Sequence, residues 1–462
     1  MRMSDVDAVT RVSSRAATAL LTMLLGSIPV HAFAQATADG QDKKEATSTG
    51  LPAGIAWTFN VDTTVGSFGF ANSLYQNPKE GVAEDLSDQW FEGSIKPALG
   101  GTHTLKNTSQ FYGKLSVVGE GTYGSQPPIF GGDISSFSVD DLSIGWRSGK
   151  AWGGENVLDL SVGRAPFNLG HGMLLWDGAA EGGSRGGYWT NARKAFEFAA
   201  IARAHPGAHT VEAFYLDKDD LPEGDTGTRL WGANYELSPG EHSTFGASYL
   251  KFYADDAVKP DRDGLDVFNV RAYTAPVPKA PDLSFEFEYA WERNGDRLHA
   301  DAWTLQGAYE VSNIAWKPKF SYRYAFFQGD DPDTPRNESF DSLLTGFYDW
   351  GTWWQGEIVG EYVAVNSNLI SNLFRVHLAP TDKIGGGIMF YTFTLDQPRA
   401  LAPNVTSTDL AKELDLYVDW KINEHFTASF VAAEANPGAA AEQAFARTRN
   451  FSYGMAFLAY HF

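Results

Sequence analysis

The chain has 462 residues, of which 14% are aromatic, and it contains 47 glycines, 14 tryptophans and no cysteine. Its formal net charge of −21 at pH 7 argues against a nucleic acid as partner and for a strongly solvated surface. No stretch after residue 34 is long and apolar enough to predict a transmembrane helix, and a chain without cysteine depends on no disulfide.

The first 34 residues have the pattern of a secretory signal peptide. Three arginines precede a short apolar run over 16–30, and small residues at Ala32 and Ala34 fit a cleavage site. A retained N-terminal anchor is the alternative. We therefore expect 1–34 to be removed on export, 35–50 to be a disordered lead-in rich in small and charged residues, and 51–462 to form the folded domain.

From residue 55 onward, runs of about 10–14 residues alternate between apolar and polar side chains, which is long enough for a tilted strand to cross a bilayer. In the run from Asp282, for example, the apolar set is Phe285, Phe287, Tyr289 and Trp291. A period of two places the two sets on opposite faces of a sheet. A soluble sandwich would also alternate, but aromatic residues near the strand ends favour a membrane barrel with its apolar face outward.

The connections between these runs alternate in length. Short turns fall at 205–207, 238–240, 380–382 and 423–425, and long acidic or glycine-rich loops fall between them. The last run, 449–462, ends on Phe462, as in outer-membrane barrels. These features predict an all-β fold, a transmembrane antiparallel β-barrel of about 18 strands with long extracellular loops and short periplasmic turns.

One block does not alternate. Between Ser339 and Arg375, Trp354, Ile358, Tyr362 and Val365 are spaced as in a helix. Treating about 329–366 as one loop gives an even strand count and places every short turn at one end of the barrel. We therefore expect this loop to carry a short helix, to fold over or into the barrel mouth as a fixed lid, and to pack on the wall through Trp353, Trp354 and Tyr362.

The candidate site is a set of basic side chains on the polar face of the strands. A lipid-facing basic residue at the bilayer midplane costs about 2–4 kcal/mol, so these side chains are expected to point into the lumen. They are Lys114, Arg147, Arg193, Arg203, Arg271, Arg323, Arg375 and Arg449.

Acidic side chains, including Glu286 and Glu288, share the inward face of the strands, so structural Arg–Glu pairing is an alternative reading of these arginines. Rings of arginine or lysine select anions, and guanidinium groups pair with carboxylates, so a polymer with one carboxylate per sugar would suit such a lumen. Phe451 and Tyr453 are candidates to stack on sugar rings.

No sequence motif for catalysis is present, so the sequence predicts no enzyme and no cofactor. His171 and Asp177 lie in a long loop, where a lone histidine is usually solvated. No metal site is predicted, although calcium at the acidic loop segments 217–220 and 329–331 is conceivable. An adhesin or a barrel-embedded enzyme is the alternative from another functional class.

Several long motifs resemble the alginate export porin family. They are SFDSLLTGFYDWGTWWQGEIVGEYVAVNSNLISNLFRVHLAPTD from Ser339, FYTFTLDQP from Phe390, LDLSVGRAPFNLGHGMLLWDG from Leu158 and RGGYWTNARKAF from Arg185. In that family an 18-stranded outer-membrane barrel secretes alginate, a linear polyuronate, through an arginine-lined constriction that loops partly occlude.

The resemblance implies that Arg164, Arg193 and Arg375 are pore positions. Arg164 shares its parity with the apolar Leu160 and Val162, so it must lie at a strand end or past a bulge to point inward.

The leading hypothesis is a monomeric outer-membrane porin that conducts alginate or a similar anionic polysaccharide out of the periplasm by passive passage. Its expected partners are the polysaccharide, outer-membrane lipid and periplasmic secretion proteins. The alternative is an uptake porin for small anions or oligosaccharides.

Overall fold

The computed structural model describes residues 54–73, 87–125, 133–176, 178–277, 282–346, 355–446 and 448–462. The predicted signal peptide, the predicted lead-in and the residues Asp177, Trp353 and Trp354 lie outside these ranges. No helix within them is long and apolar enough to cross a membrane.

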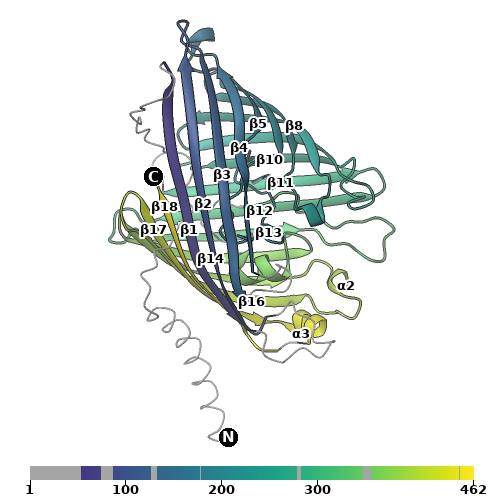
Figure 1. The fold of residues 1–462 in the computed structure, drawn as a ribbon. Helices are drawn as coiled ribbons and strands as arrows, with labels where there is room; N and C mark the ends of the chain where they lie inside the picture. The colour runs from purple at the N-terminus through teal and green to yellow at the C-terminus, as the bar shows by residue number, and fades with distance from the viewer. Residues whose placement is uncertain are drawn as a thin grey trace, which may run out of the picture.

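The described residues form 18 antiparallel strands joined by loops and five short helical segments (Figure 1). The strands are β1 Ala56–Ala71, β2 Asp88–Thr104, β3 Gln110–Ser125, β4 Ile134–Arg147, β5 Leu158–Arg164, β6 Phe198–Ala204, β7 His209–Asp217, β8 Arg229–Gly240, β9 Ser243–Tyr253, β10 Asp266–Thr274, β11 Leu283–Asn294, β12 Leu298–Glu310, β13 Lys319–Phe327, β14 Leu369–Thr381, β15 Ile384–Thr394, β16 Asp409–Lys421, β17 Phe426–Pro437 and β18 Phe451–His461. The helical segments are η3 Ala151–Gly153, η4 Pro222–Gly224, η5 Gly356–Val363, α2 Pro398–Leu401 and α3 Ala439–Phe445.

Each strand pairs with the next, and β18 closes the barrel on β1, with Asp62 opposite His461. The predicted antiparallel barrel of 18 strands is therefore confirmed. Closure gives every strand two neighbours, although the first residues of β1, before Asp62, pair with no strand other than β2.

The two faces of the barrel wall are inverted relative to a soluble protein. On β11, Phe285 and Phe287 are exposed on the outside, whereas Glu288 and Glu292 are buried on the inside. Phe137, Ile144 and Phe374 are also exposed on the outer face. A closed wall with an apolar outer surface is the arrangement that a lipid bilayer requires.

The loops divide as predicted, with short turns at the end that also holds the start of β1 and the end of β18. There the Asn423 carboxamide oxygen accepts hydrogen bonds from the backbone N–H groups of His425 and Phe426, which fixes the β16–β17 turn. We call this the periplasmic end and the opposite end the extracellular end.

Among the described residues between β13 and β14, 328–346 and 355–368, no strand is present, which confirms the predicted loop. Its helical segment η5 is a π-helix, and Ile358, Val359 and Tyr362 in it are buried. The Tyr362 ring contacts the rings of Phe70 and Phe451, at centroid distances of 5.9 and 5.6 Å. The prediction that Tyr362 packs this loop against the wall is confirmed.

The same contacts correct the expectation for Phe451 and Tyr453. Phe451 is completely buried and Tyr453 nearly so, and both rings contact Tyr362. In this arrangement they hold the loop in the lumen and present no ring face to a sugar.

Candidate functional site

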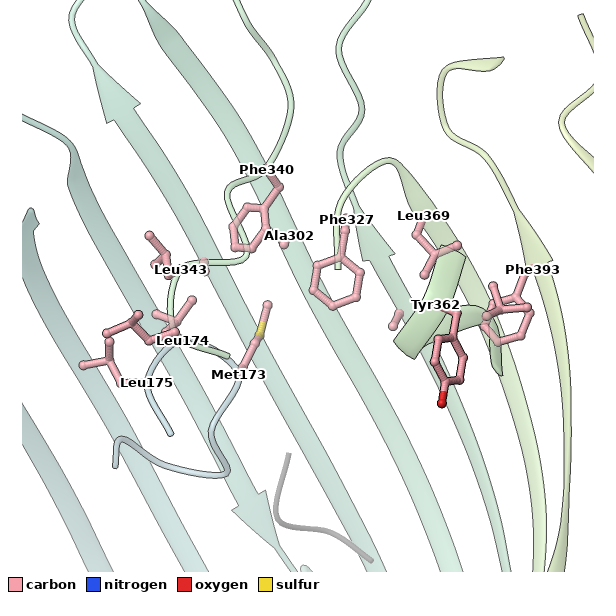
Figure 2. Packing of buried hydrophobic residues seen from close by; sticks show 14 of the residues in the cluster. Met173, Leu174, Leu175, Ala302, Phe327, Phe340, Leu343, Tyr362, Leu369 and Phe393 are labelled. Carbon is pink, nitrogen blue, oxygen red and sulfur yellow. The ribbon is translucent and has the colours of Figure 1, made fainter. Parts of the chain in front are cut away.

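Two long loops meet inside the barrel and narrow the lumen. The β5–β6 loop (165–197) and the β13–β14 loop (328–368) join through a parallel bridge between Leu175 and Leu344. The Trp176 N–H donates to the Leu344 carbonyl at 2.8 Å, and the Leu344 N–H donates to the Leu174 carbonyl at 3.1 Å. Figure 2 shows Leu174 and Leu175 beside Leu343, which is also buried. The two loops therefore form one packed unit.

Carboxylates on the inner wall hold this unit by its backbone. The two carboxylate oxygens of Glu413 on β16 accept the N–H groups of Ile358 and Val359, both at 2.8 Å. Glu92 on β2 accepts the N–H groups of Trp189 and Thr190 at 2.7 and 3.0 Å. Each carboxyl group thereby satisfies two backbone N–H groups that would otherwise be buried without an acceptor. Much of the inward-facing acid in this chain therefore has a structural role.

A buried ion pair fixes the β13–β14 loop on its other side. Arg262 in the β9–β10 loop donates Nε to Asp341 at 2.8 Å and Nη2 at 2.5 Å. The Asp341 N–H donates to Glu292 on β11 at 2.8 Å. Burial acts to raise the pKa of Asp341, but the charge and hydrogen bonds of Arg262 outweigh it and hold the pKa below its usual range.

Arg193 lies in the β5–β6 loop, not on a strand as predicted, because β6 begins only at Phe198. The loop turns back into the lumen, where the Arg193 side chain is almost fully buried and bonds Glu120 on β3. Its backbone N–H donates to Glu181 at 2.6 Å. Burial, followed by the charge of Glu120, raises the pKa of Glu181 well above its usual range. Arg193 is thus enclosed by acids and protein.

Arg164 is the last residue of β5, as its parity required. The preceding Gly163 has φ +125°, and a Cβ there would lie 2.2 Å from the Leu142 carbonyl oxygen, so only glycine fits. After this irregularity, Arg164 Nη2 donates to Asp219 at 2.5 Å. Arg185 reaches the other oxygen of the same carboxylate at 2.7 Å.

Arg271 on β10 is fully enclosed by polar groups of its own wall. Its guanidinium donates to Asn234 and Glu236 through Nη2 at 2.5 and 2.6 Å. Its Nη1 donates to Ser248 at 2.8 Å. Glu288 beside it accepts from Asn269 at 3.0 Å and from Tyr273 at 3.1 Å.

His171 is packed and not simply solvated, contrary to expectation. Its ring stacks on Tyr273 at a centroid distance of 3.6 Å, and its Nδ1 lies 3.1 Å from a Glu286 carboxylate oxygen. The contacts of Glu286 and Tyr273 therefore tie the β5–β6 loop to β10 and β11.

Four of the predicted cations keep partly exposed side chains on the inner wall. Arg147 pairs with Asp159 at 2.8 Å and lies over the Tyr112 ring. Arg203 pairs with Glu212 at 2.5 Å, and Lys114 pairs with Asp141 at 3.0 Å. All three are on the periplasmic half of their strands.

Arg375 on β14 donates to the Tyr417 hydroxyl at 3.1 Å, and His377 Nδ1 lies 2.7 Å from the same oxygen. Like the other three, Arg375 keeps a partly exposed side chain on the inner wall.

The remaining two predicted positions differ from each other. Arg323 is buried on β13. Arg449 was expected on the last strand, but β18 begins at Phe451, and Arg449 is exposed in the segment before it. The placement of Arg449 on the strand was wrong because the apolar alternation that defines the strand starts two residues later.

Sequence reasoning missed several charged residues of the lumen. Lys96 on β2 is nearly buried against Asp140 and Asp141, and parity alone would have found it because Phe91 and Ile95 are exposed on the opposite face. Arg185 and Arg262 lie in loops, where no alternation indicates direction. The partners of both arginines are distant in sequence, so no local signal identified them.

Carboxylates in both acidic segments considered for calcium accept hydrogen bonds from the protein. Asp220 accepts from Lys218 and Thr226, and Asp330 accepts from the Glu338 N–H. Among the described residues, no three or more His, Cys, Asp or Glu side chains are arranged to hold a metal ion.

Comparison with known proteins gives a family and a fold. A family model described as Alginate export matches residues 148–455. Among curated proteins, none matches the chain.

Three solved structures illustrate the fold. OccAB2 of Acinetobacter baumannii has a TM-score of 0.55 and 13% identity, covering 87% of this chain and 98% of that chain. OccK5 (OpdH) of Pseudomonas aeruginosa has a TM-score of 0.53 and 12% identity, covering 87% and 97%. OccK2 (OpdF) of Pseudomonas aeruginosa, solved in complex with glucuronate, has a TM-score of 0.51 and 12% identity, covering 87% and 97%. At these identities the similarity concerns the fold alone.

Proposed function

The chain is an outer-membrane β-barrel that belongs to the alginate export family, and we propose that it conducts an anionic polysaccharide, alginate or a similar polyuronate, out of the periplasm. Passage is passive and involves no chemical step on the polymer. The observation that carries the proposal is the group of partly exposed cations on the inner wall, Lys114, Arg147, Arg203 and Arg375.

Three of these cations, Lys114, Arg147 and Arg203, lie on the periplasmic side, where the polymer would enter. Arg147 ends β4 at its periplasmic end, and Arg203 is one residue from the periplasmic end of β6. Guanidinium groups bind carboxylates through paired, charge-assisted hydrogen bonds. An incoming uronate chain would therefore meet its first cations at the periplasmic mouth.

The acids beside the cations limit how tightly a carboxylate is held. Asp159 and Glu212 each accept one hydrogen bond from the arginine they face. A uronate carboxylate must compete with these acids, so each contact is weak and exchangeable. Conduction requires binding that is favourable enough for entry and weak enough for exit. This arrangement suits a polymer that slides from one cation to the next.

The packed loop unit adds a size limit. The bridge between Leu175 and Leu344 and the anchors at Glu92 and Glu413 hold both loops within the lumen. We expect the narrowed opening to admit a linear polymer in single file and to exclude a folded protein.

The direct test of export is to delete the gene and measure secreted uronic acid polymer, with the wild-type protein and a cation variant reintroduced. We expect deletion to abolish secretion and the Arg147→Gln/Arg203→Gln variant to restore it only in part. Unchanged secretion after deletion would contradict the proposal.

A second candidate is uptake of small anions such as a monomeric uronate. The observation in its favour is the structure of OccK2 (OpdF), which has the same fold and was solved with glucuronate. The same wall cations would serve this role. Uptake predicts slow growth on a uronate as sole carbon source after deletion, with polymer secretion unaffected, whereas export predicts the reverse.

A further inference from the structure

The outer wall of the barrel carries an apolar groove near its periplasmic end. The groove has a volume of about 670 Å³ and crosses β1 to β5. Its walls include Trp57, Leu99, Phe111, Ile144 and Leu160. Phe111 and Ile144 are more than half exposed. These apolar side chains are on the outer face of the wall and point away from the lumen.

Two glycines on neighbouring strands form the floor of the groove. Gly101 on β2 lies directly opposite Gly113 on β3. Both share the outward parity of Leu99 and Leu115, so two positions that would carry lipid-facing side chains carry none. A Cβ on Gly101 would lie 3.1 Å from the Trp57 ring and 3.3 Å from Ile55, so these two side chains pack over Gly101. The two glycines thus leave a short stretch of bare backbone beside long apolar side chains.

The groove lies toward the periplasmic ends of the strands that form it. β1 begins at Ala56, six residues before Asp62, which pairs with His461 at the end of the chain. Figure 1 shows β1, β2 and β3 running past the C-terminal end of β18. Trp57 and Trp146 both line the groove, and tryptophan rings are enriched at membrane interfaces.

Cations lie at the periplasmic rim of the groove. Lys106 is exposed in the turn between His103 and Phe111, which both line the groove, and Lys150 is exposed in the turn that follows Trp146. The two turns contact each other, since the Lys150 N–H donates to the Thr108 hydroxyl at 2.8 Å. Trp152 in the second turn is 70% exposed. One exposed acid, Glu155, shares this turn.

We propose that this groove binds one phospholipid of the inner leaflet of the outer membrane, with an acyl chain on the Gly101–Gly113 floor and the phosphate between Lys106 and Lys150. The apolar walls match an acyl chain, and the lysines match a phosphate at the depth where headgroups lie. A bound lipid would cover the apolar outer surface of the part of the wall that extends furthest beyond the end of β18.

The test uses the full barrel in vesicles of phosphatidylethanolamine and phosphatidylglycerol. A phosphatidylethanolamine with a photoactivatable acyl chain is crosslinked, and labelled peptides are identified by mass spectrometry. We expect labelling of the peptides that hold Trp57, Phe111 and Ile144 to exceed labelling near Leu305 on the same outer surface about tenfold. Even labelling around the wall would overturn the proposal, because it would indicate only general lipid contact.

The first variant tests where the acyl chain of the lipid lies. Gly101→Leu fills the floor and should lower groove labelling about tenfold. The matched Gly307→Leu, on the outer face where a Cβ has ordinary contacts with Phe285, should leave it unchanged. Heat-modifiable mobility in gels checks that both variants fold.

The Lys106→Gln/Lys150→Gln variant should reduce labelling by the phospholipid but not by a diacylglycerol probe that lacks a headgroup. Labelling that Gly101→Leu does not reduce would exclude the groove. Groove peptides that label in vesicles but are shielded in intact cells would assign the groove to a protein partner instead.

Discussion

Arg262 and Asp341 form a two-point ion pair that joins the β9–β10 loop to the β13–β14 loop inside the barrel mouth, with N–O distances of 2.8 and 2.5 Å. Both side chains are mostly buried. Removing one partner of a buried pair leaves the other charge unpaired and costs about 3–5 kcal/mol. This pair and the Glu413 and Glu92 anchors attach the loop unit to the wall, which supports the expectation that it is a fixed lid.

Arg262→Ala is predicted to loosen the lid. The uncompensated Asp341 would leave its buried position, so single-channel recordings in planar bilayers should show higher mean conductance and more frequent current fluctuations. The matched control is Arg297→Ala, because Arg297 pairs with Asp256 in the same region but both side chains are more than half exposed. Exposed pairs contribute about 0–1 kcal/mol. Equal effects of the two substitutions would contradict the assigned role of Arg262.

The pH dependence of this pair follows from the lowered pKa of Asp341. A depressed pKa in the folded state means that the pair stabilises the lid above the ordinary value of 3.8 and is lost as pH falls through the folded value. Wild-type current fluctuations should therefore be unchanged across the neutral range and increase only in strong acid.

Glu413→Ala is predicted to release η5 from the wall. The N–H groups of Ile358 and Val359 would lose their acceptors, and each buried unsatisfied group costs about 1–3 kcal/mol. Hydrogen exchange at these two amides should accelerate about tenfold to a hundredfold. Glu424→Ala, in an exposed periplasmic turn, serves as the control and should leave both amides protected.

The fold could be predicted from the sequence because the sequence patterns that indicate it are local. The alternation with a period of two predicted which side chains lie on each face of a strand. The short turns with Asn, Pro and Gly predicted which end of the barrel is periplasmic. The helical spacing around Ile358 and Tyr362 showed that this segment is a loop and not a further strand, which led to the count of 18 strands. The sequence did not indicate that this helix is a π-helix or that Glu413, 55 residues away from Ile358, accepts its N–H groups.

The candidate site could be predicted only in part. The alternation of apolar and polar residues shows which face of the sheet a side chain lies on, but not which residues it contacts. It correctly placed Arg147, Arg203 and Arg271 on the inner face. It could not show that Arg271 is enclosed while Arg147 remains accessible. Arg193 illustrates the limit, since a loop carries it back to Glu120, 73 residues earlier in the chain.

Arg147→Gln/Arg203→Gln is predicted to weaken anion selectivity. Both side chains are about one-third exposed on the inner wall, and the substitutions remove two positive charges from the periplasmic mouth. Reversal potentials in a salt gradient should shift toward cation permeability, and the concentration of oligouronate that half-blocks the current should rise about tenfold. Arg399→Gln, at an exposed extracellular pair with Asp333, should change neither quantity. Selectivity that is unaffected by the double substitution would exclude these arginines from the conduction path.

Glu181→Gln is predicted to stabilise the β5–β6 loop at neutral pH. Burial and the charge of Glu120 raise the pKa of Glu181, so its carboxylate form is disfavoured in the folded protein. For an acid with a raised pKa, the stability contribution is fully present below the ordinary value of 4.5 and is lost as pH rises through the folded value. Glutamine keeps an oxygen that can accept the Arg193 N–H but carries no charge.

Thermal unfolding should therefore show a Tm about 1–2 °C higher for Glu181→Gln than for the wild type near pH 8, and no difference near pH 4. Glu223 provides the opposite case in the neighbouring β7–β8 loop. Hydrogen bonds from the Ser184 hydroxyl and N–H lower the pKa of Glu223, so Glu223→Gln should give no gain in Tm at neutral pH. A Tm for Glu181→Gln that falls at pH 8 would show that Glu181 is needed as a charged partner of Arg193.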